Sequence, residues 1–494
     1  MNTKSVTPLF IGMVSLYFLF LAYLVFRYNY VMMDTVWALW HQPEKHVLVN
    51  SRASEGRVFY GYSQEFFFGL AGKISNIRYL RALSWVGWIA CIGLFYTMLN
   101  RIERKGGLSS GNWTIRLTIA FTAASLPVIL YIGWASCGDR FIPALLSLTA
   151  GLLLFEKTIK GGWGGAALAL AIVLGIVALF FYQTCYPFFL LPFYCLYLNR
   201  KDGKFTKPML VGLSCYFLSL ALYYLLFRSS LHYMGITSGE RTALRFDPLD
   251  RLSFFFSYPM NQAFNLNFFF DAQSVLSQAV FPVLFAGWLL FEFFYRKGKA
   301  LVKLRYVVGL TGWWILGYLP QLVAQESFGA YRTMPVLGVM VLLMIADNLL
   351  PLVKEGRRKD LLGLALVALF LIRGGYVYYT YMVRPFSEEY RTVKTAVSSH
   401  YNAQIKNVVF VLADEDGFLP GLGIRHQKDE FAMPSTYKDW TPEPLVKQIV
   451  YELTGNRHEA EMLKVSVYRN TSEIPDRSIL GRSDVMFIDA HTLF

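Results

Sequence analysis

The stretch "TPLFIGMVSLYFLFLAYLVF", residues 7–26, decides the fold class of this chain. It carries no charged side chain, and its twenty residues match an α-helix that crosses the hydrocarbon core of a bilayer. Similar runs recur along the chain, and 55% of its 494 residues are hydrophobic, more than in ordinary soluble domains. We therefore expect an α-helical polytopic membrane protein. Hydropathy predicts about eleven spans, near residues 8–27, 79–99, 116–136, 141–156, 164–182, 186–198, 209–227, 278–295, 306–325, 333–351 and 361–381.

Lysine and arginine residues predict the orientation of these spans. They cluster in "RIERKGG" (101–107), "EKTIK" (156–160), "NRKDGKFTK" (199–207), "YRKGKALVKLR" (295–305) and "KEGRRKD" (354–360). The clusters fall in every second loop, so the positive-inside rule places them and the N-terminus in the cytoplasm, and the C-terminus outside. We expect a multi-pass protein of the inner (plasma) membrane. Because the net charge of +14 arises mainly in these short loops, it does not indicate a nucleic-acid partner.

Two units follow from this topology. Residues 1–382 form the predicted membrane domain, with outer loops at 28–78 and 228–277, and residues 383–494 form a predicted soluble domain outside the membrane. The second loop contains "FDPLDRLSFFFSYPMNQAFNLNFFF" (246–270), whose aromatic runs are too interrupted to span. Aromatic rings favour the membrane interface, so we expect an amphipathic helix or a re-entrant segment there.

The C-terminal segment predicts a small α/β domain of order α-β-α-β-β. "SEEYRTVKTAVSSHY" (387–401) is a predicted helix that Ser387 would cap, and "TPEPLVKQIVYELTG" (441–455) is one that begins after Thr441 and ends at Gly455. The predicted strands are "KNVVFVLA" (406–413), "LKVSVYRN" (463–470) and "SDVMFID" (483–489). "GLGIRH" (421–426) lacks the third glycine and the following helix of a nucleotide-binding fingerprint, so no nucleotide cofactor is expected.

Asp34 is the leading catalytic candidate. It follows the first span directly and opens "NYVMMDTVWALWHQPEKHVLVNSRASEGRVFYGYSQEFFFG" (29–69), a loop that mixes acids with several cations, including Lys45. An acid at the membrane boundary is costly enough to suggest a function, here a base that accepts a proton from an acceptor hydroxyl. Alternatively, Asp34 is a helix-end carboxylate paired with Arg27 or Lys45.

A second pair, Asp139 and Arg140, lies in "WASCGDRFIP" (134–143) at the outer end of two spans. Asp139 is either the N-cap of the next helix or a second acid beside Asp34. Arg140 would grip a phosphate, for which a planar guanidinium is better suited than an ammonium group.

Further candidates lie at the outer ends of other segments. Arg57 follows Gly56, which lets the backbone approach a ligand, while Tyr60 and Tyr62 would either stack on a sugar or belong to the interfacial aromatic belt. Glu326 and Arg332 flank "SFGAY" (327–331) at the start of a span. Arg373 lies inside the last span, where it would face a polar cavity and contact phosphate, or snorkel outward. His41 and His46 lack a third ligand at metal spacing, so no dedicated metal site is expected.

Together these features resemble the GT-C superfamily of membrane glycosyltransferases, in particular the O-antigen glucosyltransferases of serotype conversion. The resemblance rests on the single span before an outer loop that opens on Asp34, on Gly56–Arg57 followed by aromatic residues, and on "RYLRALSWVGWIACIGLFYTMLNRI" (78–102). The short second loop with Asp139 and the outward C-terminal domain also fit. The layout covers most of the membrane part, although few residues are shared.

The resemblance implies an inverting transfer of a sugar from a polyprenyl-phosphate donor to a lipid-linked glycan or another cell-envelope acceptor on the outer leaflet. Asp34 would be the base, and the phosphate would be held by Arg57, Arg140, Arg332 or Arg373. Such transferases often carry two adjacent acids after the first span, whereas Met33 precedes Asp34 here. This departure shifts weight to Asp139 and leaves open whether a divalent cation (Mg or Mn) is needed.

Two other functions are compatible with the same topology. An O-antigen or capsule polymerase is also polytopic with a large outer loop and arginines, but it more often ends in the cytoplasm without a folded outer domain. A transporter or flippase of lipid-linked sugars usually shows paired repeats and broken helices in matching halves, and neither pattern is found in this sequence.

Overall fold

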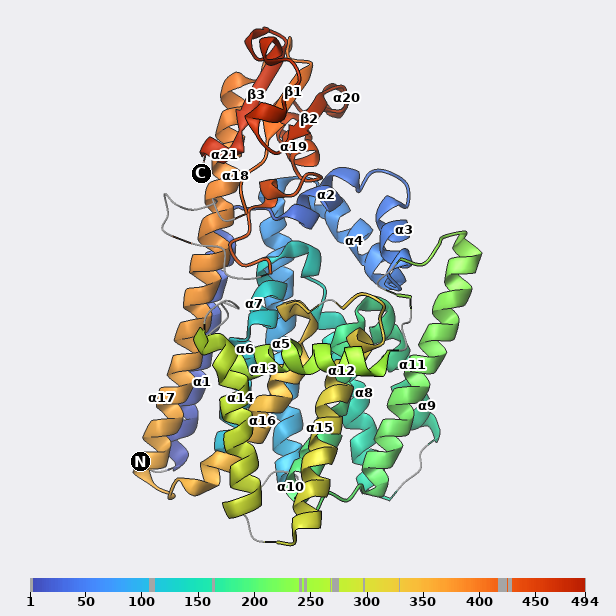
Figure 1. Ribbon diagram of the computed structural model, residues 1–494, viewed down its shortest axis with the longest axis vertical. Coiled ribbons are helices and arrows are strands. Elements are labelled where there is room, and N and C mark those ends of the chain that lie inside the picture. Colours follow the sequence, from blue (N-terminus) through green and yellow to red (C-terminus); the bar gives the residue numbers. More distant parts are fainter. Residues whose placement is uncertain are drawn as a thin grey trace.

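The chain folds into a bundle of long helices that carries a small α/β unit at one end (Figure 1). A computed structural model describes residues 3–105, 112–161, 165–239, 242–243, 247–266, 268, 275–295, 298–327, 329–415, 424 and 429–493. The predicted glycine pair of "GLGIRH" lies outside these residues. Helices dominate the bundle, as expected for segments that must satisfy their backbone hydrogen bonds within a lipid environment.

Eight helical segments among the described residues are long and apolar enough to cross a membrane, so this is a multi-pass helical membrane protein. They contain α1 (Thr3–Arg27), η1 (Ile74–Asn76) with α5 (Ile77–Arg104), α6 (Asn112–Ala123) with α7 (Leu126–Gly133), η2 (Ala135–Cys137) with α8 (Phe141–Ile159), α11 (Lys207–Met234), α14 (Val275–Leu290) with η4 (Phe291–Tyr295), α16 (Pro335–Leu349) with η6 (Leu350–Leu352), and α17 (Arg357–Tyr378) with its continuation. Each coincides with a predicted span.

The remaining three predicted spans correspond to other helical segments. The run at 164–182 is α9 (Gly165–Phe181), an apolar helix of 17 residues. The run at 186–198 divides between a 3-10 segment, η3 (Gln183–Leu190), and a short helix, α10 (Leu191–Arg200). The run at 306–325 lies mainly in α15 (Ala300–Leu322), which has 23 residues and carries Pro320 near its end.

Both predicted outer loops contain short helices. The first forms α2 (Met33–His41), α3 (Val47–Ser54) and α4 (Val58–Ala71), which cover the end of the bundle nearest the α/β unit (Figure 1). The second forms α12 (Pro248–Ser257) and α13 (Pro259–Asn265), of which α12 lies across the bundle (Figure 1).

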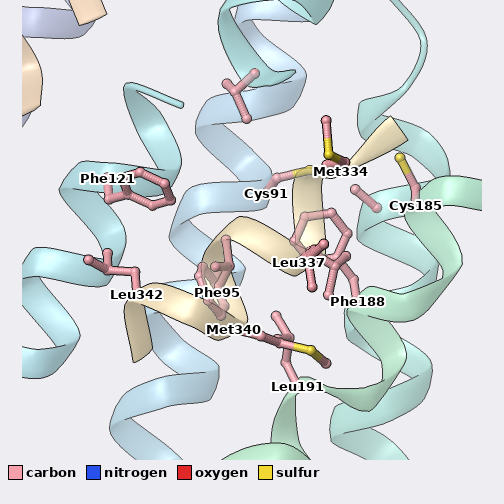
Figure 2. Close-up of a cluster of buried hydrophobic side chains, with 14 of the residues drawn as sticks. Cys91, Phe95, Phe121, Cys185, Phe188, Leu191, Met334, Leu337, Met340 and Leu342 are labelled. Carbon is pink, nitrogen blue, oxygen red and sulfur yellow. The ribbon is translucent and has the colours of Figure 1, made fainter. Parts of the chain in front are cut away.

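The core of the bundle is apolar and tightly filled. Figure 2 shows side chains from α5, α6, η3, α10 and α16 meeting in one cluster, among them Phe95, Phe121, Phe188 and Met340. These residues are at most 3% exposed, so the helices are closely packed at this point. A core of this kind fixes the helix ends on which the site described below is built.

The C-terminal unit contains a parallel three-stranded sheet of order β2-β1-β3, formed by β1 (Asn407–Val411), β2 (Lys464–Tyr468) and β3 (Val485–Asp489). All three strands were predicted, and α19 (Pro442–Thr454) begins after Thr441 and ends at Gly455 as predicted. Short segments complete the unit: η9 (Ser435–Tyr437), α20 (Arg457–Glu461), η10 (Thr471–Glu473), η11 (Arg477–Gly481) and α21 (Ala490–Leu493).

The predicted helix start at Ser387 is wrong. Helix α17 continues through a π-helical turn, η7 (Tyr379–Val383), into α18 (Arg384–His400), so Ser387 lies inside a helix. Pro385 is accommodated because the wider π turn before it changes the pattern of backbone hydrogen bonds. The predicted boundary at 382/383 therefore falls within continuous helix.

The α/β unit packs directly on the helices of the first outer loop. Buried side chains of α2 and α4 share one hydrophobic cluster with those of β1, α18 and α19. Polar contacts reinforce it: the Arg457 guanidinium lies 4.2 Å from the Trp40 ring and donates to the Trp40 carbonyl, and Glu452 accepts from the Ile74 backbone N–H at 2.6 Å. The C-terminal unit therefore contacts α2, the helix that carries Asp34.

Candidate functional site

A cavity of about 480 Å³ lies at the end of the membrane part that faces the C-terminal unit. Its charged lining residues, which we call the polar wall, are Asp34, Arg52, Glu55, Arg57, Arg140 and Arg332. Apolar residues also line it, and we call apolar wall the group formed by Phe217, Leu220, Ala221 and Phe227 of α11 with Leu319 and Val323 at the end of α15. Four arginines around one cavity form a strongly cationic surface.

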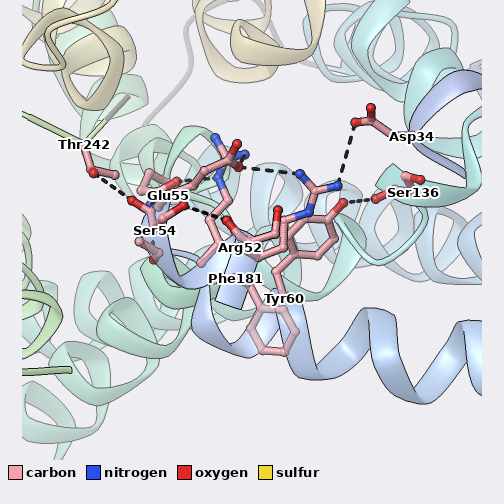
Figure 3. Close-up of polar contacts among 12 residues, drawn as sticks. Asp34, Arg52, Ser54, Glu55, Tyr60, Ser136, Phe181 and Thr242 are labelled. Carbon is pink, nitrogen blue, oxygen red and sulfur yellow. Dashed lines mark hydrogen bonds and ion pairs between the residues drawn. The ribbon is translucent and has the colours of Figure 1, made fainter. Parts of the chain in front are cut away.

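Asp34 presents its carboxylate to the cavity from the first turn of α2, where a negative charge is favoured by the helix dipole. Its Oδ2 lies 3.8 Å from Nη2 of Arg52, and its side chain is 34% exposed (Figure 3). This separation is longer than a charge-assisted hydrogen bond. The carboxylate is therefore oriented by a cation and can still accept a proton from a bound ligand.

Arg52 connects the two acids of the polar wall. Its Nη1 lies 3.9 Å from Glu55 Oε2, and its Nε donates to Gln64 Oε1 at 2.9 Å. Burial lowers the pKa of Arg52, but Tyr60, Asp34 and Glu55 raise it by more, so the net pKa lies above the ordinary value. Arg52 is consequently a permanent cation between Asp34 and Glu55.

Arg57 is held beside it by Glu55 and Gln183. The Arg57 Nη1 lies 2.7 Å from Glu55 Oε2, and its Nε donates to Gln183 Oε1 at 3.2 Å. The preceding Gly56 has a φ of 75°, and a Cβ there would lie 2.3 Å from the Tyr223 hydroxyl oxygen. Only glycine allows this approach, so the Gly–Arg pair predicted from the sequence does place an arginine at the cavity.

Arg140 lies between two aromatic rings. Its guanidinium carbon is 3.8 Å from the ring centroids of both Tyr60 and Tyr182, and its side chain is 3% exposed. Cation–π contact on both faces fixes the plane of the guanidinium while its edge remains available for hydrogen bonds. On another side, Asp139 Oδ1 lies 3.7 Å from Nη1.

Tyr60 joins this arrangement to the backbone of η2. Its hydroxyl donates to the Ser136 carbonyl and accepts from Gln64 Nε2 at 2.6 Å (Figure 3). Burial raises its pKa, an effect that Arg140 and Arg52 oppose but do not cancel. The hydroxyl therefore stays protonated, and the ring keeps Arg140 in place.

Arg332 reaches the cavity from η5 (Tyr331–Thr333), on the other side of the polar wall. Its guanidinium lies 4.9 Å from the Trp134 ring and forms an ion pair with Glu430. Burial lowers the pKa of Arg332, but Tyr182, Cys137 and Asp34 raise it by more. This arginine is thus also a fixed cation.

Two residues of the apolar wall are exposed. Phe217 and Ala221 line the cavity and lie one helical turn apart on α11, one of the helices long and apolar enough to cross a membrane. The cavity therefore combines a cationic surface with an exposed apolar one.

The structure brings together six of the ten residues predicted for the site. Those that line the cavity are Asp34, Arg57, Tyr60, Arg140, Glu326 and Arg332. Asp139 lies behind the wall, where its Oδ2 accepts from Ser63 at 2.7 Å beside a void of about 20 Å³. The others are not among the lining residues: Lys45 and Tyr62 are exposed, and the Arg373 guanidinium lies 5.3 Å from the Tyr376 ring on α17.

Several lining residues were not predicted. Arg52 and Glu55 belong to the charged first loop, so their residue types were a signal, but their pairing was not. Tyr182 and Gln183 follow directly on an apolar run, and nothing in the sequence connects Gln183 with Arg57, 126 residues away. In the part of the chain that the structure describes, no three His, Cys, Asp or Glu side chains converge to hold a metal ion.

Comparison of this chain with protein-family models, with curated proteins and with solved structures finds no match. The cavity is therefore the main indication of the function of this protein.

Proposed function

We propose that this protein is an integral membrane glycosyltransferase that moves a sugar from a polyprenyl-phosphate donor to a lipid-linked glycan or another cell-envelope acceptor, with inversion. The single observation that carries the proposal is a cavity lined both by four arginines and by apolar residues of α11, two of which are exposed. A phosphate that carries a sugar and a long hydrocarbon chain combines the same two kinds of chemistry. GT-C-like topology and the outer leaflet as the place of reaction belong to the proposal.

Asp34 takes the role of the base. It accepts the proton of the acceptor hydroxyl, whose oxygen attacks the anomeric carbon of the sugar. The bond from that carbon to the phosphate oxygen breaks on the opposite face, and the phosphate leaves with the electron pair. Among the polar-wall acids Asp34 suits this role better than Glu55, because Glu55 is only 2.7 Å from Arg57 and is neutralised by it.

The arginines take the role of stabilising the departing phosphate. Arg57, Arg140 and Arg332 all line the cavity, and each is held by aromatic rings or by a carboxylate before any ligand arrives. Preorganised cations at the position where negative charge develops are among the most effective catalytic devices. These guanidinium groups stabilise the negative charge on the departing phosphate.

The test is sugar transfer in proteoliposomes from radiolabelled polyprenyl-phosphate donors, comparing wild type with Asp34→Asn. The expected result is transfer by wild type and a loss of at least about 100-fold in the variant, because a positioned base contributes that much or more. Asp439→Asn, an exposed aspartate of the C-terminal unit, is the matched control and should keep full activity.

Other outcomes would redirect the assignment. Transfer that survives Asp34→Asn would move the base to another residue of the wall. If wild type transfers no sugar but donor appears on the opposite leaflet, the protein is a flippase. If it joins repeat units instead of adding single sugars, it is a polymerase.

A further inference from the structure

One segment of the C-terminal unit leaves that unit and packs into the membrane part. We call this segment, Asp429–Met433, the strap. The strap precedes α19, and its residues lie against the membrane part. Phe431 is fully buried and belongs to the hydrophobic core of the membrane part, where its ring centroid lies 6.0 Å from that of Tyr331. The Ala432 N–H donates to the Tyr381 carbonyl at 2.8 Å.

The strap contacts one cavity cation and the residue that precedes it. Asp429 Oδ2 accepts from the Tyr331 backbone N–H at 2.7 Å, and Glu430 forms an ion pair with the neighbouring Arg332. Asp429 and Ala432 both adopt left-handed backbone conformations, with φ of 53° and 60°. Such conformations are unfavourable for alanine and persist where surrounding contacts hold them, as they do here on either side of Glu430.

Glu430 pairs with a cavity cation without being part of the cavity lining. Arg332 lines the cavity whereas Glu430 does not, and the two side chains are 15% and 9% exposed. Glu430 therefore holds the guanidinium without itself lining the ligand space. A guanidinium has donors on more than one edge, so one edge can bind Glu430 while another faces a ligand.

We propose that Glu430 is a positioning residue that acts through Arg332, so that the C-terminal unit forms part of the anion site of the membrane part. An arginine side chain loses considerable rotamer entropy when a ligand immobilises it. A carboxylate behind the guanidinium removes that cost beforehand, which strengthens binding by preorganisation. The identification of the anion as a polyprenyl phosphate rests on the proposed function, whereas the contact itself does not.

The first experiment is a double-mutant cycle on the full-length protein in nanodiscs, with undecaprenyl phosphate as the probe. We expect Glu430→Gln to weaken binding about tenfold when Arg332 is present, and by less than twofold in an Arg332→Ala background, because the effect passes through that side chain. An equal loss in both backgrounds would overturn the proposal.

Glu452→Gln is the matched control. It makes the same change of charge at another contact between the C-terminal unit and the membrane part, where Glu452 accepts from Ile74, and it should leave binding unchanged. If Glu452→Gln weakens binding as much as Glu430→Gln does, Glu430 only helps to dock the unit and the inference is wrong. Thermal unfolding of each variant shows that the protein compared is folded, and Glu430→Asp, which keeps the charge but shortens the reach, replaces Glu430→Gln if that variant does not fold.

A second readout separates this inference from the proposed function. If wild type does not bind undecaprenyl phosphate, the proposed substrate class fails, and hydrogen exchange of the peptide covering 329–335 then decides on Glu430. Glu430→Ala should accelerate exchange there at least fivefold, while Glu452→Gln should not. Equal exchange in both variants would show that Glu430 does not hold this segment.

Discussion

The polar wall of the cavity consists of side chains that other protein groups hold, whereas the apolar wall is left partly exposed. Arg140 lies between the rings of Tyr60 and Tyr182, and Arg57 lies between Glu55 and Gln183. In the apolar wall, Phe217 and Ala221 line the cavity and are exposed. The first wall is rigid before ligand binds, and the second is completed by lipid or by the ligand.

This difference suggests a division of labour. Rigid charges suit the chemical step, because they need no reorganisation while charge develops. An open apolar face suits recognition of a long chain, because burial of hydrocarbon is non-directional and grows with the area removed from water. Substitutions in the polar wall should therefore change stability and turnover, and those in the apolar wall should change the dependence on chain length.

The largest effect, on protein stability, is expected at the buried ion pair of Arg140 and Asp139. Arg140→Ala leaves the Asp139 carboxylate buried, with Ser63 as its remaining hydrogen-bond donor among the described residues. Removing one partner of a buried ion pair costs about 3 kcal/mol or more, so the variant should unfold at a markedly lower temperature. Adding Asp139→Asn should restore much of the loss. A double variant as unstable as Arg140→Ala alone would show that the stacking on Tyr60 and Tyr182 dominates instead.

The second effect tests the apolar wall. Ala221→Trp fills the cavity from α11 and should weaken binding of a long polyprenyl phosphate about tenfold, while binding of a phosphate with a single prenyl unit changes little. Leu225→Trp on the same helix is exposed but does not line the cavity, and it serves as the control. Equal losses for both chain lengths would mean that α11 does not recognise the hydrocarbon.

The third effect concerns the rings that hold Arg140. Tyr182→Leu removes one of the two stacking faces and should reduce affinity for polyprenyl phosphate by about fivefold, since a cation–π contact is worth about 1 kcal/mol. Tyr182→Phe keeps the ring and should bind within twofold of wild type. If Tyr182→Phe binds polyprenyl phosphate as weakly as Tyr182→Leu does, the hydroxyl of Tyr182 and not its ring supports binding.

Hydropathy was sufficient for the fold class, because a bilayer imposes a length and an apolar composition that can be counted along the chain. The first strand of the C-terminal unit was predicted for a similar local reason, since its apolar run is continuous. The start at Ser387 was wrong because the capping pattern cannot reveal that α17 continues through a π-helical turn.

For the site as well, residues marked by local sequence features were predicted, whereas contacts between distant segments were not. Asp34, Arg57 and Arg140 were predicted because each is a charged residue in an outer loop close to the end of a predicted span. The contacts that hold them were not, since Arg57 meets Gln183 and Arg332 meets Glu430 across 126 and 98 residues. Only the packed fold shows which cations share a cavity.

The smallest effect is expected for Arg373, which was a candidate phosphate ligand in the sequence but does not line the cavity. Arg373 was a predicted phosphate ligand, but it donates to the Phe268 carbonyl at 3.4 Å and stands over Tyr376, away from the lining residues. Arg373→Gln should therefore leave affinity for undecaprenyl phosphate within twofold, whereas Arg57→Gln should reduce it about tenfold, because a charge-assisted contact is lost. A loss for Arg373→Gln as large as that for Arg57→Gln would place the anion outside the cavity. It would also require α17, not the two walls, to contribute the binding surface.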